Sequence, residues 1–151
     1  MAAAPALETD AAQVVEAFLD GTLDPDHWTH AAHLAVGLRL VRRLPFESAV
    51  TAMREGILAF LARRGPSTGT GYNATITRFY LHLIAAWDAA HPSTGDFAAD
   101  VARLVADVGP RHLPAQFYSA GRLGSPEAVT GWVEPDLRPL PPLAGALRSV
   151  A

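Results

Sequence analysis

Three histidines, His27, His30 and His33, lie three residues apart in the segment 26–34, which reads DHWTHAAHL. The ordinary pKa of imidazole lies near neutral pH, so this side chain serves both as a general acid–base group and as a metal ligand. Thr29 is a favourable N-cap residue, and a helix that begins there carries His30 and His33 in its first turn. The segment therefore predicts a catalytic site or a metal site at a helix start.

The helix start favours the neutral form of these two imidazoles. Backbone N–H groups at a helix N-terminus carry partial positive charge, which disfavours imidazolium, and a general base or a metal ligand must be neutral. Gly37 follows one turn after His33 and costs about 1 kcal/mol relative to alanine inside a helix. This indicates a need for space, either for a neighbouring helix or for a ligand. The alternative, that the histidines are ordinary caps or buried hydrogen-bonding groups and Gly37 serves only packing, stays open.

Residue types missing from the chain narrow the chemistry further. The sequence has no cysteine, which excludes thiolate catalysis, disulfides and cysteine-type zinc sites. All twelve basic residues are arginine, so Schiff-base chemistry and the lysine of a P-loop are excluded as well. Chemistry in this chain must use His, Asp, Glu, Tyr, Ser, Thr or Arg, or a bound cofactor.

The composition is that of one globular domain. The chain has 151 residues, of which half are hydrophobic and 18% are charged. A formal net charge of −3 without basic blocks argues against a nucleic-acid partner. No apolar run approaches the roughly 20 residues of a membrane span, and the start MAAAPALETD lacks the features of a signal peptide. We therefore expect a cytoplasmic protein with a small-molecule partner, no nucleic acid and no membrane.

Apolar residues recur at helical spacing through most of the chain, and no segment alternates as a strand would. We expect an all-α, single-domain bundle of five to seven helices over residues 1–151. Residues 1–8 are expected to be a flexible N-terminus, and the Pro-rich segment 133–151 an extended C-terminal strap. The helices are predicted between Thr9 and Gly21, from about Thr29 to Arg43, from Pro45 to Gly65, from Tyr72 to Pro92, from Thr94 or Asp96 to Val108, and after Ser125.

The fourth predicted helix supplies candidates for a pocket against the second. Asn73, Thr77 and Tyr80 recur at i, i+4 and i+7 and share one side of the helix. Arg78 lies beside them, although an arginine in a helix is more typical of an ion pair with an acid, and Tyr80 suits a core position equally well. The residues expected to bind a substrate are Trp28, Tyr72, Thr77, Arg78, Phe79, Tyr80 and Tyr118.

Four blocks of the sequence resemble a known pattern. WTHAAHLAVGL, GYNATITRFYL, FYSAGRL and WVEPDLRPLP occur in this order between residues 28 and 141. Together they are similar to a family of small uncharacterised bacterial proteins, whose pattern reads approximately WTHAAHL…GYHETITRFWL…YYSRERL…WVEPDL. The resemblance covers most of the chain.

This resemblance implies a divalent metal such as Zn²⁺ or Fe²⁺, held by the two histidines of the first block with a His and a Glu of the second. The chain departs from the pattern at those two positions, where it has Asn73 and Ala74. To complete the site, His27, Glu134 or Asp136 would have to serve as replacement metal ligands. The two carboxylates are more typical of residues that attach the C-terminal strap to the bundle. The metal site is therefore a weaker expectation here than in the family.

The function we expect is that of a small-molecule enzyme of specialised metabolism that works without a cofactor in an interhelical pocket. His33 is the expected general base or acid, His30 and Asn73 orient the substrate, and Arg78 holds an anionic group. The matching reactions are isomerisation, cyclisation and elimination. Two alternatives remain: a metal-dependent enzyme with a His30/His33 centre, and a non-catalytic small-molecule-binding protein that has lost the family's metal ligands. Monomer and homodimer both fit the pattern.

Overall fold

The computed structural model describes residues 3–64, 72–110 and 112–143, and within these ranges the protein is all-α. The described residues form eight α-helices and one short 3₁₀-helix, η1, with no strand. The all-α class is confirmed, and the two helices beyond the predicted ones, α6 and α7, are each about one turn long. The bounds are α1 Ala3–Asp20, η1 Pro25–His27, α2 His30–Arg43, α3 Phe46–Arg64, α4 Ala74–Ala90, α5 Phe97–Val108, α6 Leu113–Phe117, α7 Ala120–Leu123 and α8 Pro126–Thr130.

Three of the four predicted N-caps are confirmed. The side chains of Thr29, Asp96 and Ser125 each accept a hydrogen bond from a backbone N–H of the first turn that follows. The predicted start of the first helix is wrong: α1 begins at Ala3, so Thr9 lies inside the helix, and residues 3–8, expected to be flexible, are helical. The physical reason is the alanine-rich start of the chain, because alanine has the highest helix propensity and a proline is tolerated in a first turn.

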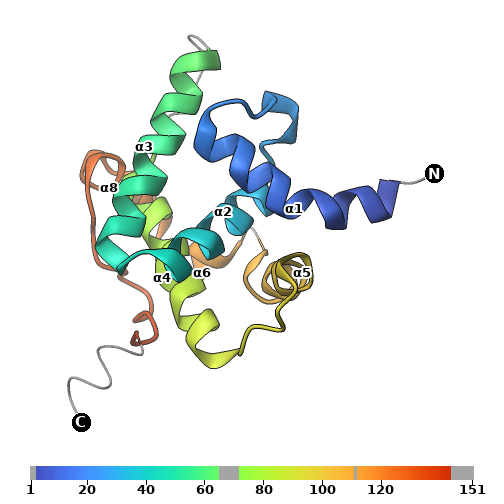
Figure 1. Ribbon diagram of the computed structural model, residues 1–151. Helices are drawn as coiled ribbons and strands as arrows, with labels where there is room; N and C mark the ends of the chain where they lie inside the picture. Colours follow the sequence, from blue (N-terminus) through green and yellow to red (C-terminus); the bar gives the residue numbers. More distant parts are fainter. Residues whose placement is uncertain (1–2, 65–71, 111, 144–151) are drawn as a thin grey trace.

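Helix α2 is the centre of the bundle, with α1, α3, α4 and α5 packed around it (Figure 1). The helix is buried on most of its circumference beyond the first turn, including Leu34, Val36 and Leu38. The candidate histidines, His30 and His33, lie in the first turn of this central helix, where neighbouring helices pack around it.

Gly37 sets the distance between α2 and α4. A Cβ placed on Gly37 would lie 2.7 Å from Cδ1 of Ile84 and 3.3 Å from Cδ2 of Leu81. Real Cβ atoms do not approach a neighbour as closely as the first of these distances. Of the two reasons that the sequence left open for this glycine, the structure supports close helix packing.

A partly buried ion-pair network ties α2 to the far end of α4 and to α5. Arg42 donates to Asp88 and to Asp100, with both N···O distances 3.0 Å. The Asp100 side chain is 1% exposed and also accepts hydrogen bonds from Ser93 and Thr94. Burial raises the pKa of Asp100, but these hydrogen bonds outweigh it and lower the pKa to about 2.

The segment 131–143, here called the strap, crosses α4 without helical structure, as the proline content predicted. Thr75 of α4 is fully buried, and its hydroxyl donates to the carbonyl of Gly131 (2.7 Å) and accepts from the N–H of Val133 (3.2 Å). The hydroxyl of Tyr118 donates to the carbonyl of Val133 at 2.8 Å. The last residues of the predicted tail, 144–151, lie outside the described part of the chain.

Among the described residues, no helix has both the length and the apolar character needed to cross a membrane.

Candidate functional site

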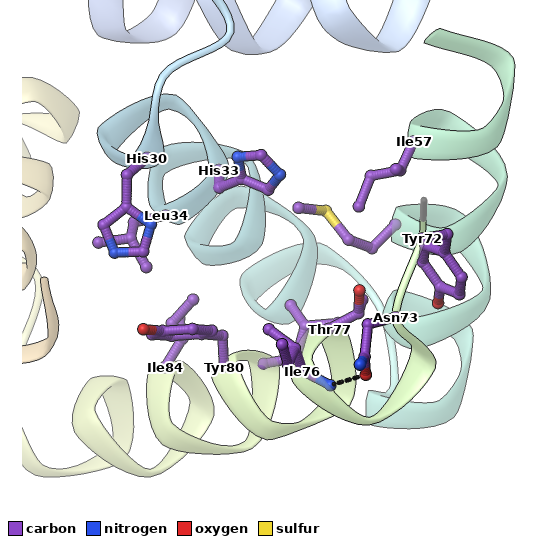
Figure 2. A pocket seen from close by; sticks show the side chains of 12 residues that line it. His30, His33, Leu34, Ile57, Tyr72, Asn73, Ile76, Thr77, Tyr80 and Ile84 are labelled. Atoms are coloured by element: carbon purple, nitrogen blue, oxygen red, sulfur yellow. Dashed lines mark hydrogen bonds between the residues drawn. The ribbon is translucent and has the colours of Figure 1, made fainter. Parts of the chain in front are cut away.

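A cavity of about 250 Å³ lies between α2, α3 and α4. Figure 2 shows it from close by, with side chains of α2 on one side and side chains of α4 on the other. The predicted pocket between the second and fourth helices is therefore present, and α3 contributes a third wall that the sequence did not suggest. The lining residues are His30, His33, Leu34, Met53, Ile57, Tyr72, Asn73, Ile76, Thr77, Tyr80, Leu81 and Ile84.

The imidazole of His33 is held in a defined orientation. Its Nδ1 lies 3.2 Å from the carbonyl oxygen of Thr29, and because a carbonyl only accepts, Nδ1 carries the proton. The indole of Trp28 packs against the imidazole at 3.8 Å between ring centroids and is itself stacked on Phe18 at 4.3 Å. In the neutral ring, Nε2 is then the nitrogen with the lone pair, which is the atom that a general base uses.

His30 occupies the other end of the same helical turn. Its ring meets that of Tyr80 from α4 edge-on, with 5.4 Å between the centroids. A shallower hollow of about 380 Å³ lies on the outer side of these residues and shares His30, His33, Ile76 and Tyr80 with the cavity. The two histidines therefore stand at the boundary between an outer hollow and the inner cavity.

Asn73 has a structural role that the sequence did not predict. It is the N-cap of α4, its Oδ1 accepts from the N–H of Ile76 (2.9 Å), and its Nδ2 donates to the carbonyl of Leu123 (3.2 Å). Helix α4 thus begins at Ala74, so Tyr72 precedes the helix although it lines the cavity. The predicted start at Tyr72 is wrong because the asparagine side chain satisfies the first-turn N–H group and ends the helical backbone there.

Tyr72 closes the cavity at the side of α3. Burial raises the pKa of Tyr72, and a hydrogen bond with Thr77 and the charge of Arg54 oppose this only in part. The phenol is therefore neutral at physiological pH. Together with Thr77 of α4, it gives the cavity two hydroxyl groups.

Four residues expected in the pocket do not line the cavity. Phe79 and Tyr118 are 0% and 1% exposed and belong to a separate aromatic cluster under the strap. Burial raises the pKa of Tyr118, so its phenol stays protonated and donates a hydrogen bond to the strap. Trp28 lies behind His33 and lines the outer hollow instead. The predicted position of Phe79 in the pocket is wrong. Because α4 is covered on two sides, helical spacing alone does not tell which side faces the cavity.

Arg78 is the fourth of these residues. Its guanidinium forms a two-pronged ion pair with Glu47 of α3, with N···O distances of 2.9 and 2.5 Å. The pair lowers the pKa of Glu47 and raises that of Arg78, and the guanidinium also lies over the rings of Phe46 and Trp132. Arg78 therefore does not line the cavity, and the ion pair that its sequence context favoured is present.

The donors present do not fit the metal centre that the family resemblance implies. The side chain of Asn73 is used in capping, and Ala74 has no donor atom. Glu134 accepts from Trp132 within the strap, and Asp136 accepts from Ser119, so neither reaches the cavity. His27 lines a different surface hollow beside α1. Among the described residues, no three His, Asp or Glu side chains lie close enough together to hold a metal ion.

The apolar part of the cavity was not recognised from the sequence. Met53 and Ile57 come from α3 and Ile76 and Ile84 from α4, and all four appear only as members of apolar stripes. A stripe that lines a cavity and a stripe that fills a core have the same spacing, so periodicity does not distinguish them. All three isoleucines of the chain line this cavity.

Neither a protein-family model nor a curated protein nor a solved structure matches this chain. The four-block resemblance is therefore not tested by these comparisons and stays a prediction.

Proposed function

We propose that the protein is a small-molecule enzyme that uses His33 as a general base in the cavity between α2, α3 and α4. The observation that carries the proposal is the position of His33: its ring lines the cavity, and its Nδ1 is committed to the carbonyl of Thr29. A base held in one tautomer, beside a space for a substrate, meets the geometric requirement for proton transfer.

The surroundings of His33 define the reactions that the site supports. The exposed surface of the lining is largely apolar, and an environment of this kind strengthens any hydrogen bond made within it. His33 would take a proton from carbon or oxygen, and His30 and Thr77 would orient the substrate's polar group. Isomerisation, cyclisation and elimination each need only such a transfer, in keeping with a role in specialised metabolism.

Two alternative functions assign a different role to the cavity: a metal centre, or binding without catalysis. A metal-dependent enzyme centred on His30 and His33 lacks suitable further donors among the described residues. A non-catalytic binding protein would use the same cavity without proton transfer. Turnover of a probe that needs only a base distinguishes the binding protein from the enzyme.

The test uses 5-nitrobenzisoxazole, a small neutral compound. A base removes the proton on its ring carbon, the C–H electron pair completes a nitrile, and the N–O bond breaks to leave a coloured phenolate. We expect wild-type protein to accelerate this elimination and His33→Ala to lose roughly tenfold or more of the rate, since positioned bases contribute about 100-fold or more to their own reactions. The matched control is His112→Ala, because His112 is exposed and its side chain makes no capping hydrogen bond.

Equal rates for wild type and His33→Ala would overturn the assignment of His33. Equal losses in His33→Ala and His112→Ala would also overturn it, since they would indicate catalysis by exposed imidazoles. Circular dichroism of each variant shows whether the α-helical fold is retained.

A further inference from the structure

The cavity combines a few polar groups with apolar side chains. His30 and His33 of α2 lie across the cavity from Thr77 of α4 (Figure 2), and much of the remaining lining is apolar: Leu34, Met53, Ile57, Ile76, Leu81 and Ile84. Such a lining favours a molecule that has an apolar body and one polar group, because burial of each part against side chains of the same kind has the lowest free energy.

The charge of the ligand follows from the side chains that surround it. The aliphatic wall penalises an ion, since a buried charge without a partner is strongly destabilised. The guanidinium nearest in sequence to this part of α4, that of Arg78, is committed to Glu47. Tyr72 stays neutral because burial raises its pKa. Arg54, whose charge acts on Tyr72, does not line the cavity, so the lining offers hydrogen bonds and apolar contact rather than an arginine counter-ion.

We propose that the cavity takes an uncharged small molecule with an apolar body and a single hydrogen-bonding group. The body lies against Ile57 and Ile84, and the hydrogen-bonding group lies between His33 and Thr77. The volume of about 250 Å³ is just below the usual range of ligand sites, which limits the molecule to a small one. This inference rests on the proposed function, since it names the ligand of the same site, but its test is one of binding and needs no turnover.

The chain provides its own reporters for such a test. Its only isoleucines, Ile57, Ile76 and Ile84, all line the cavity. Protein labelled with ¹³C at the isoleucine δ1 methyl groups therefore gives three NMR signals, and each of them comes from a residue that lines this cavity.

Three probes of one shape separate the contributions of charge and polarity: 2-naphthol, naphthalene and 2-naphthoate. At neutral pH 2-naphthol is uncharged, whereas 2-naphthoate is an anion. We expect 2-naphthol to shift all three methyl signals in a saturable way, naphthalene to bind several-fold more weakly, and 2-naphthoate to bind at least tenfold more weakly.

Binding of 2-naphthoate as tight as that of 2-naphthol would overturn the assignment of an uncharged ligand. Equal affinities for naphthalene and 2-naphthol would overturn the role of the hydrogen-bonding group, and unchanged methyl signals with all three probes would overturn the ligand class. None of these results alters the loss of elimination rate expected for His33→Ala, so a failure of this inference and a failure of the proposed function are distinguishable.

A charge-introducing variant provides the converse test. Thr77→Lys places an ammonium group at position 77 of the cavity lining, and we expect it to reverse the preference, so that 2-naphthoate binds more tightly than 2-naphthol. The isoleucine spectrum of the variant without a probe shows whether it is folded. A folded variant that still prefers 2-naphthol would overturn the conclusion that charge in this wall selects the ligand.

Discussion

Gly37 of α2 and Ile84 of α4 are in such close contact that a single added methyl group would meet the isoleucine side chain at 2.7 Å. Ile84 is also part of the cavity wall. The packing of the two helices and the shape of the candidate site are therefore linked through one side chain. A change made on the core side of Ile84 is expected to appear on the cavity side.

Gly37→Ala tests this link. The added Cβ should push Cδ1 of Ile84 into the cavity, and we expect 2-naphthol to bind several-fold more weakly. The free energy of unfolding should change by no more than about 1 kcal/mol, because the helix propensity gained by replacing glycine offsets the cost of repacking. Isoleucine methyl NMR and urea denaturation measure the two effects.

Gly121→Ala is the matched control, since a Cβ at Gly121 of α7 meets no atom within 4 Å. It should leave 2-naphthol binding unchanged. Unchanged binding in Gly37→Ala as well would contradict the link between the packing and the cavity.

The network of Arg42 and Asp100 predicts a specific loss of stability in acid. The pKa of Asp100 is about 2 in the folded protein and has an ordinary value of 3.8. Because the folded-state pKa is the lower one, its contribution of about 2 kcal/mol is complete above about pH 4, is lost as the pH falls toward 2, and is absent below that. Urea denaturation at a series of pH values measures this loss.

Asp100→Asn isolates the contribution of this carboxylate from that of other acids. At neutral pH the variant should be about 2 kcal/mol less stable than wild type, since Arg42 retains Asp88 but a buried partner has been lost. The difference should shrink toward zero as the pH approaches 2. A difference that is constant over this range would show that the charge of Asp100 is not the cause.

Arg78 is expected to matter for stability but not for the candidate site. Arg78→Met removes the ion pair with Glu47, which is largely exposed, and should cost about 1 kcal/mol or less. Elimination of 5-nitrobenzisoxazole should proceed at the wild-type rate. A double-mutant cycle with Glu47→Gln measures the coupling, and a loss of rate in Arg78→Met would return this residue to the site.

Thr75 is expected to be the main polar attachment of the strap to α4. Thr75→Val keeps the shape of the side chain but leaves the carbonyl of Gly131 and the N–H of Val133 without this partner. The free energy of unfolding should fall by about 2 kcal/mol, since two backbone groups lose a buried hydrogen bond. Thr51→Val, on the exposed face of α3, is the control and should change stability by less than about 0.5 kcal/mol. Equal effects of the two substitutions would contradict this role of Thr75.

Local signals in the sequence were sufficient for most of the secondary structure. Thr29, Asp96 and Ser125 cap their helices as predicted, because a cap depends on a side chain and a backbone group only a few residues apart. The same local chemistry accounts for the two errors at helix starts. The alanine-rich start extends α1 to Ala3, and Asn73 caps α4 where a continued helix was expected.

The sequence by itself determined the all-α class, the chemistry available to the chain and the position of His30 and His33 in the first turn of α2, because these depend on composition and short-range spacing. Only the tertiary structure decided which side of α4 faces the histidines, and it placed Ile76 and Thr77 in the cavity but Phe79 in a separate cluster. The physical reason is that an apolar side chain at helical spacing buries itself equally well against any neighbouring helix, so the choice of neighbour depends on how the whole chain packs.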